Sequence, residues 1–354
     1  MQERKKNLRW SLVFALIAAL TVWAVTSQWK NFSLGALAAR LAAADPGWMA
    51  AAFAGMFGFL FFEGCAVRSA CEALGYPIPI SRGLAFAAAD IYFSAITPSA
   101  SGGQPACALL MRRRGIPGCV SAPVLMLTLM MYTLSILAIG LLSLLLGPAV
   151  FFSFGPAARI LIAVGTVLQI LLALAFFGLL RSGSLLRQLC FGVLRLLAKL
   201  RLIRNLEAKE ARVQRTMDEY ARRAKVLTGR RGLLLRSFLY NFLQRLSVIS
   251  VSVFVFLALG GAPRHALRVL AMQSYVVIGS VSIPIPGAMG VTDFLMIDGF
   301  SALMTEELAV QIALIARAVS FYSCVLLCGL IVLAATRRAL RENEGDAEGK
   351  TGDE

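Results

Sequence analysis

Apolar residues run in long unbroken stretches along this chain instead of alternating with polar residues. A helix crosses the bilayer core, about 30 Å thick, with about 20 consecutive apolar residues. Several stretches reach that length, and 58% of all residues are hydrophobic. The pattern predicts an all-α polytopic membrane protein. The predicted spans are residues 10–29, 48–67, 120–146, 159–180, 233–259 and 308–335.

The first apolar stretch follows the basic segment MQERKKNLR. It is longer than the apolar part of a signal peptide, and no small-residue cleavage pattern closes it. We therefore expect an uncleaved first span. The seven cysteines are odd in number and lack CxxC spacing, and there is one histidine. A disulfide framework, a metal site and histidine catalysis are therefore not expected, and no cofactor is predicted.

Positive charge is concentrated in one segment. The chain has 35 Lys or Arg and 19 Asp or Glu, a net charge of +16. Residues 181–232 hold 14 of these basic residues and four acidic ones, with leucines at helical spacing. This basic amphipathic segment predicts contact with the anionic inner-leaflet surface. Nucleic acid is not expected as a partner, because basic cytoplasmic loops are common in membrane proteins.

Two apolar stretches, residues 83–111 and 269–302, are interrupted by glycines and prolines. If residues 83–111 crossed the membrane once, the basic segment 181–232 would lie outside, against the positive-inside rule. If residues 83–111 instead form a re-entrant hairpin, which enters and leaves the membrane on the cytoplasmic side, residues 181–232 lie inside as the rule requires. The prediction is six spans and two re-entrant hairpins in one domain, residues 1–338, with both termini cytoplasmic and a disordered polar tail, residues 339–354. The two halves would then have opposite orientation, so an inverted repeat stays open.

The interruption in the first hairpin reads TPSASGGQP. Irregular backbone at membrane depth is tolerated where it is buried in protein or lines a wet cavity. Pro98 and the Gly102–Gly103 pair break the helix, and Ser101 or Gly102 is expected to cap a new half-helix. Its N-terminus would direct free N–H groups at an anion such as a phosphate.

The second interruption, SIPIPGAMGVTD, repeats this arrangement. Pro286 and Gly287 are expected to break the helix and Gly290 to turn the chain. Thr292 or Asp293 would then cap the next helix.

Ionisable residues at membrane depth are candidates for function. We expect Arg317 to hold a lipid phosphate, with a structural ion pair to Asp293 or Asp298 as the alternative. Arg245 is a second candidate, unless it snorkels to the surface; Glu63 is expected to anchor the end of its helix or to function. The predicted substrate-binding set is Thr97, Ser101, Gly102, Gly103, Gln104, Arg317, Arg245, Asp90, Pro286, Gly287, Gly290 and Asp293.

With these motifs the chain resembles the transmembrane region of lysylphosphatidylglycerol synthases, a flippase-like family. The matching pieces are ITPSASGGQPACALLMRRRGIP, SIPIPGAMGVTD and IARAVSFYSCVLLCGL. In full-length members a soluble domain transfers lysine from aminoacyl-tRNA to phosphatidylglycerol; here about 19 residues follow the last predicted span. The resemblance implies movement of an anionic or aminoacylated phospholipid, such as lysylphosphatidylglycerol, between leaflets of the cell membrane, with links to lipid metabolism and antibiotic resistance.

The leading hypothesis is therefore a lipid translocase whose partners are membrane phospholipids. No GxxxxGK[ST] motif is present, so movement would be downhill or coupled to an ion gradient through Asp90, Asp293 or Glu63. A phosphatidylglycerol lysyltransferase, testable with charged tRNA, and a scaffold that recruits a partner through residues 181–232 are the alternatives. A homo-oligomer and a separate synthase partner both stay open.

Overall fold

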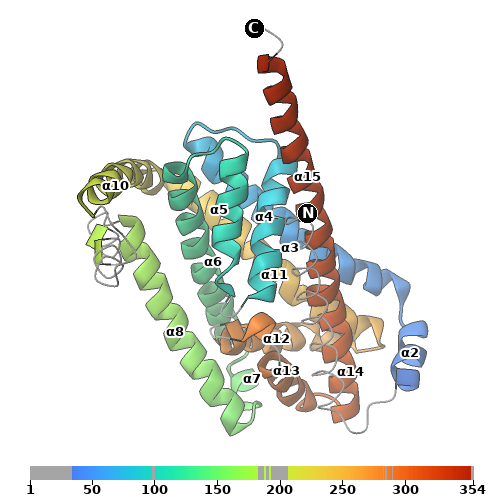
Figure 1. The fold of residues 1–354 in the computed structure, drawn as a ribbon. Coiled ribbons are helices and arrows are strands. Elements are labelled where there is room, and N and C mark those ends of the chain that lie inside the picture. The colour runs from blue at the N-terminus through green and yellow to red at the C-terminus, as the bar shows by residue number, and fades with distance from the viewer. Residues whose placement is uncertain are drawn as a thin grey trace.

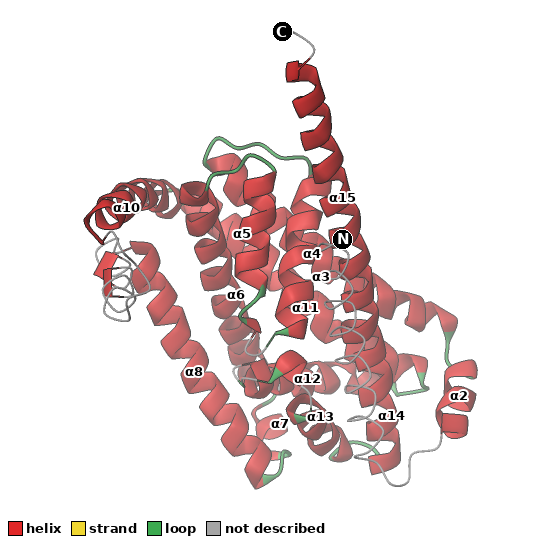
Figure 2. Ribbon diagram, in the orientation of Figure 1, coloured by secondary structure: helices red, strands yellow, loops and turns green. Residues whose placement is uncertain are grey.

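The computed structural model describes residues 34–97, 100–181, 187–188, 191–192, 206–281, 283, 285–288 and 290–351. Over these residues the chain is helical and has no strand (Figure 2), which confirms the predicted all-α class. Within the described part, five helices are long and apolar enough to span a membrane: Pro46–Ala73, Gly118–Leu145, Pro156–Leu180, Arg231–Ala258 and Glu306–Arg337. They correspond to the second to sixth predicted spans, and the first, residues 10–29, lies outside the described residues.

The continuous spans are α3 (Pro46–Ala73), α6 (Gly118–Leu146), α8 (Pro156–Arg181) and α11 (Arg231–Ala258). Helix α3 begins where the side chain of Asp45 accepts a hydrogen bond from the Trp48 amide at 2.9 Å, with Pro46 in the first turn. Both features are favoured at helix N-termini. The shorter helices are α2 (Leu34–Ala42), α7 (Pro148–Phe152) and η2 (Pro263–His265).

The last span is built from three pieces. These are α14 (Glu306–Arg317), the π-helical segment η4 (Ala318–Ser323) and α15 (Cys324–Thr351). A π-helical turn inside an α-helix often marks a functional site. Helix α15 runs through Thr351, so it includes most of the segment predicted as a disordered polar tail. Its arginines, alanines and glutamates are good helix formers that extend the span.

The first interrupted stretch forms a pair of packed helices, α4 (Ile80–Ile96) and α5 (Gly103–Arg113). The chain enters and leaves this hairpin at the same end of the bundle, where α10 (Leu206–Gly229) also lies (Figure 1). The second stretch forms α12 (Ala266–Val281), η3 (Pro286–Ala288) and α13 (Val291–Ser301). Helices α12 and α13 lie toward the opposite end (Figure 1). Two broken hairpins thus approach the middle of the bundle from opposite ends.

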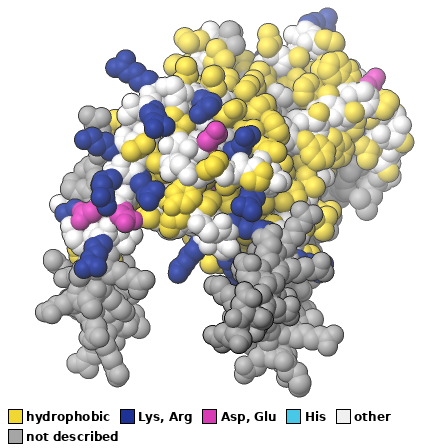
Figure 3. All heavy atoms as spheres, turned by 90° about the horizontal axis from the view of Figure 1, so that it is seen from above, with side chains coloured by type: hydrophobic (Ala, Val, Ile, Leu, Met, Phe, Trp, Pro, Cys, Tyr) yellow, Lys and Arg dark blue, Asp and Glu magenta, His cyan; other side chains and the backbone are white. Residues whose placement is uncertain are grey.

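The outer surface fits a membrane. Large apolar side chains of α8 face outward, including Ile160 and Leu174, which are 64% and 63% exposed. Lys and Arg side chains gather on the face seen from above in Figure 3. An apolar belt with a basic end is the distribution expected of a membrane protein.

Helix α10 is fastened to this basic end mainly by apolar packing. Tyr220, Ala224 and Leu227 are at most 1% exposed, and the Tyr220 hydroxyl lies 3.4 Å from the carbonyl oxygen of Leu179, to which it donates. Burial raises the pKa of Tyr220 to about 12, so the hydroxyl remains a donor at physiological pH. This contact joins α10 to the end of α8.

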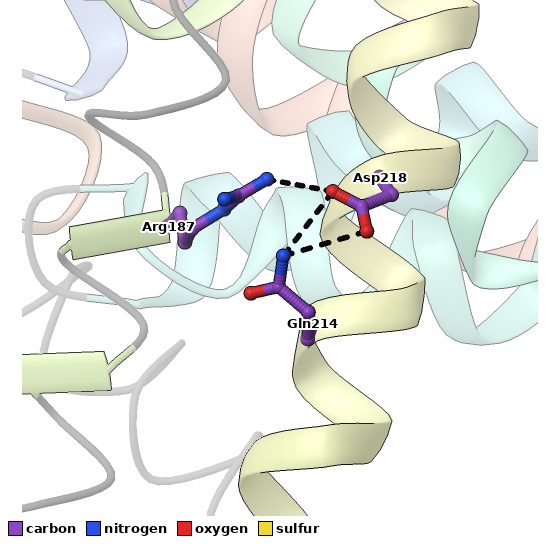
Figure 4. Close-up of polar contacts among 3 residues, drawn as sticks. All are labelled: Arg187, Gln214 and Asp218. Carbon is purple, nitrogen blue, oxygen red and sulfur yellow. Dashed lines mark hydrogen bonds and ion pairs between the residues drawn. The ribbon is translucent and has the colours of Figure 1, made fainter.

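An exposed ion pair also connects α10 to the preceding segment. Arg187 Nη2 lies 2.6 Å from Asp218 Oδ1, with Gln214 beside both (Figure 4). Its side chains are 40% and 50% exposed. An ion pair in such contact with water contributes about 0–1 kcal/mol, so the buried side chains contribute more to the docking of α10.

Candidate functional site

A cavity of about 470 Å³ lies inside the helix bundle. Residues of both hairpin tips line it, together with side chains from α3, α4, α5, α6, α8, α11, α12, α13, α14, η4 and α15. Its charged side chains among the described residues are Glu63, Asp90, Arg245 and Arg317. The volume is in the range of small-ligand sites. Polar and charged side chains on the wall of a cavity inside the bundle account for the irregular backbone of both tips.

The tip of the first hairpin is held by its own side chains. Thr97 Oγ1 accepts from the Gly102 amide at 2.9 Å and donates to the Phe93 carbonyl at 2.6 Å. Gly102 is the N-cap of α5, one of the two caps predicted, and Pro105 lies in the first turn. Ala100 has a φ of 53°, a left-handed conformation that costs about 1–2 kcal/mol for a non-glycine residue.

The N-terminus of α5 is next to a carboxylate from the same chain. Asp90 Oδ2 accepts from Gln104 Nε2 at 2.5 Å, and Asp90 Oδ1 accepts from Ser94 Oγ at 3.2 Å. A β-carbon at Gly103 would collide with both Asp90 and Ser94. Asp90 therefore lies against the first turn of α5, where the sequence predicts a lipid phosphate.

The second tip carries a matching carboxylate. Gly287 and Gly290 have φ values of 61° and 77°, and Ala288 has 48°. Gly290 is the N-cap of α13, and its amide donates to Asp293 Oδ2 at 3.1 Å. The N-cap is therefore Gly290 and not Thr292 or Asp293 as predicted; Asp293 lies in the first turn of the helix and contributes to the capping through this hydrogen bond. Each half-helix begins beside an acidic side chain of the protein.

Arg317 ties the last span to the second tip. Its Nε lies 3.1 Å from Asp293 Oδ1, its Nη2 donates to the Gly287 carbonyl at 3.3 Å, and its guanidinium lies 5.2 Å from the centre of the Phe321 ring. Both charged side chains are largely buried, at 7% and 14% exposed. The ion pair with Asp293, left open by the sequence, is present.

Arg245 is in a different environment, although it is also buried. It is 9% exposed, and its guanidinium carbon lies 4.9 Å from the centre of the Phe59 ring and 4.4 Å from that of Tyr132. Its Nε donates to Gln244 Oε1 at 3.1 Å. Within the described part of the chain, Nη1 and Nη2 of Arg245 have no hydrogen-bond partner, and no carboxylate lies within 4.0 Å.

Two carboxyl groups line the cavity wall. Glu63 of α3 is 5% exposed and accepts from Gln244 Nε2 at 2.8 Å. Asp90 of α4 lines the same cavity. Glu63 is therefore part of the wall and not a surface anchor of its helix, whereas Arg68, five residues further on, is exposed.

Comparison with known proteins agrees with this architecture. The family model of the lysylphosphatidylglycerol synthase TM region matches residues 10–328. The chain belongs to this family. A UPF0104 membrane protein of Pyrococcus horikoshii is 32% identical over 108 residues, which are 30% of this chain and 32% of that protein. The matched region of the synthase TM family includes both hairpins and the whole cavity wall.

In this member of the family, the predicted binding residues fall into two groups. Asp90, Gln104, Arg245, Gly287 and Arg317 line the cavity. The others lie in the two hairpin tips but do not line the cavity; these are Thr97, Ser101, Gly102, Gly103, Pro286, Gly290 and Asp293.

Sequence reasoning missed several wall residues, among them Phe59, Tyr132, Gln169 and Gln273. The two glutamines could have been found, because a buried amide inside an apolar span needs a partner. Phe59 and Tyr132 could not, because aromatic residues are common in membrane spans. Over the described residues, no three His, Cys, Asp or Glu side chains are grouped to hold a metal ion.

Proposed function

We propose that this protein moves an anionic phospholipid between the leaflets of the cell membrane. The headgroup would pass through the central cavity while the acyl chains stay in the surrounding lipid. The single observation that carries this proposal is the state of Arg245. It is a buried guanidinium on a cavity wall whose terminal nitrogens have no protein partner among the described residues.

The setting of Arg245 suits a phosphodiester. A guanidinium offers parallel N–H groups that match two oxygens of a phosphate. The rings of Phe59 and Tyr132 stabilise the charge by cation–π contact, and such contact does not use up the N–H groups of the guanidinium. An arginine inside a membrane is costly without a partner. A lipid phosphate at the cavity would be that partner.

The amide oxygens on the same wall suit the rest of a headgroup. Asn241 Oδ1 and Gln104 Oε1 are buried and accept no hydrogen bond. Their orientations are set, because Asn241 Nδ2 donates to the Ser237 carbonyl and Gln104 Nε2 donates to Asp90. These oxygens can accept from the hydroxyls of a glycerol headgroup or the ammonium groups of an aminoacylated one. Phosphatidylglycerol and its lysyl ester are therefore the first substrates to test.

The charge distribution suggests which end of the helix bundle faces the cytoplasm. We place α10 and the basic face of Figure 3 in the cytoplasm, against the anionic inner leaflet. The end of α15 lies on the same side of the bundle (Figure 1). The first hairpin would then enter from the cytoplasm and the second from outside, so that the cavity lies between two half-helix tips. This is the arrangement of sites in transporters with inverted repeats.

The proposal is tested in proteoliposomes that carry fluorescent phosphatidylglycerol. A membrane-impermeant reductant bleaches only the labelled lipid in the outer leaflet. Labelled lipid that moves from the inner to the outer leaflet is therefore detected as additional bleaching. Purified protein should raise the bleached fraction above that of protein-free liposomes, with a rate that increases with protein content. Bleaching equal to that of protein-free liposomes for both phosphatidylglycerol and its lysyl ester would contradict the proposal.

A further inference from the structure

We propose that the cavity opens sideways into the membrane between α8 and the two hairpin tips, and that the acyl chains of a bound phospholipid pass through this opening. The identity of the lipid rests on the proposed function. The position of the opening rests on the exposure of the cavity wall and on the packing of α8, and it can be tested without measuring transport.

The cavity is partly open to the outside, and three of its wall residues show where it opens. Leu172 of α8 is 38% exposed, and Ile285 of the second tip is 39% exposed. Ala100 of the first tip is also exposed, and all three residues line the cavity. The other lining side chains are buried or partly buried. The cavity therefore reaches the surface of the bundle between α8 and the two tips.

Helix α8 packs against the bundle on either side of Leu172. In its first half, a β-carbon at Gly165 would collide with the Ile278 carbonyl oxygen, so α8 and α12 are in direct contact there. Its last turn is held by α10. Between these contacts, Gln169, Leu172 and Phe176 follow Gly165 at the spacing of one helix face and line the cavity.

The first hairpin does not close the wall beside this face of α8. Helix α5 packs on α4 and α6 but makes no extended contact with α8. Its exposed side chains include Leu109, at 53%. No pair of packed helices therefore separates the cavity from the surroundings between α5 and α8.

The opening lies at a depth where the surroundings are acyl chains. Helix α8 carries no charged residue between Arg159 and Arg181. Leu172 is nine residues from Arg181 and 13 from Arg159, which is about 13 Å and about 20 Å along a helix that rises 1.5 Å per residue. The hydrocarbon core is about 30 Å thick, so Leu172 lies within it. The opening therefore meets lipid and not water.

The opening and the inner wall differ in chemistry as the two parts of a phospholipid do. The three exposed side chains at the opening are apolar, whereas the inner wall presents the guanidinium of Arg245 and the unpartnered Oδ1 of Asn241. A cavity of about 470 Å³ is in the size range of small-ligand sites. It can hold a headgroup, but not two acyl chains that each cross half of a core about 30 Å thick. With the phosphate at Arg245, the chains must leave through an opening into lipid.

The position of the opening is tested with wild-type protein in liposomes that contain a photoreactive phosphatidylglycerol. The probe carries a diazirine beside the ester bond of one acyl chain, a part of the molecule that lies near the surface of a bilayer. Only a lipid whose headgroup has entered the cavity brings this group to the depth of Leu172. After irradiation, peptide mass spectrometry should find the label on Leu172 and Ile285, and not on Leu174, which is 63% exposed on the outer face of α8. Equal labelling of Leu172 and Leu174, or label on neither, would overturn the opening.

The use of the opening is tested by obstruction. Leu172→Trp adds bulk where the acyl chains pass and should slow the transfer of fluorescent phosphatidylglycerol about tenfold or more. Leu174→Trp, the matched control on the outer face, should transfer lipid at the wild-type rate. Wild-type transfer by a folded Leu172→Trp variant would overturn the opening as the lipid path. If that variant fails to fold, the labelling of wild-type protein decides alone.

The two measurements also separate the opening from the proposed function. Wild-type protein that is labelled at Leu172 but moves no lipid would refute the proposed function and leave the opening in place. Wild-type protein that moves lipid without label at Leu172 would do the reverse.

Discussion

Arg317 and Asp293 form a buried ion pair, with Nε of the arginine 3.1 Å from Oδ1 of the aspartate. The arginine belongs to the last span, and the aspartate lies in the first turn of α13. The arginine Nε lies beside the carboxylate without directing a well-aligned hydrogen bond at it. The pair thus joins two elements that are distinct in the sequence, mainly through charge. It gives Arg317 a structural partner in the absence of lipid.

Removal of Arg317 should therefore destabilise the protein. Arg317→Ala leaves the Asp293 carboxylate buried without its cation, which costs about 3–5 kcal/mol in the free energy of unfolding. Denaturant unfolding in detergent measures the loss. The double variant Arg317→Ala/Asp293→Asn should recover part of the stability, because no charge is left unpaired. An Arg317→Ala variant as stable as wild type would show that the pair contributes nothing, and would return Arg317 to a role toward substrate.

Gly103 should tolerate no side chain, because Asp90 and Ser94 pack directly against it. Gly103→Ala must displace the first tip from α4, at a cost of about 1–3 kcal/mol for overpacking. Gly118→Ala is the matched control, since Gly118 also begins a helix and has no atom within 4 Å of an added β-carbon. It should change stability by less than about 0.5 kcal/mol. Equal effects at the two positions would argue against close packing of the tip.

The proposed orientation predicts which residues a membrane-impermeant thiol reagent can label in intact cells. Gly229→Cys, at the end of α10, should be protected until the membrane is permeabilised. Arg264→Cys, in η2 at the start of the second hairpin, should be labelled at once. The wild-type protein, whose described cysteines are buried or partly buried, gives the background. The reverse pattern would invert the orientation.

The sequence predicts the two hairpin tips well, because the break in each helix is caused by glycine and proline residues within the tip itself. Gly102, Gly287 and Gly290 lie where the backbone turns or a helix begins, and glycine marks such positions in any context. Long apolar runs predict the described spans for the same reason. The helix N-terminus at α5 was also recognised. Its neighbour, Asp90, was predicted on the same hairpin but not as the group beside that N-terminus.

The partners of the buried charges could not be predicted, because they depend on packing between distant segments. The sequence left Asp293 and Asp298 equally open to Arg317. In the structure Asp298 instead accepts from the Gly155 amide at 2.8 Å, 143 residues away in the chain. The π-helical turn after Arg317 and the cation–π contact of Arg245 with Tyr132 likewise cannot be predicted from the hydropathy pattern. The sequence therefore predicts which charged residues lie at membrane depth, but it does not predict which residues they contact.

Arg245 tests the central claim most directly, through the rate at which fluorescent phosphatidylglycerol moves between leaflets in proteoliposomes. Arg245→Ala removes charge-assisted hydrogen bonds of about 1.5–3 kcal/mol and should slow transfer by about 10- to 140-fold. Arg245→Lys keeps the charge without the planar fork and should be intermediate. Arg236→Ala, which removes an exposed arginine from the same helix, should transfer lipid at the wild-type rate. Equal rates for Arg245→Ala and wild type would contradict the account.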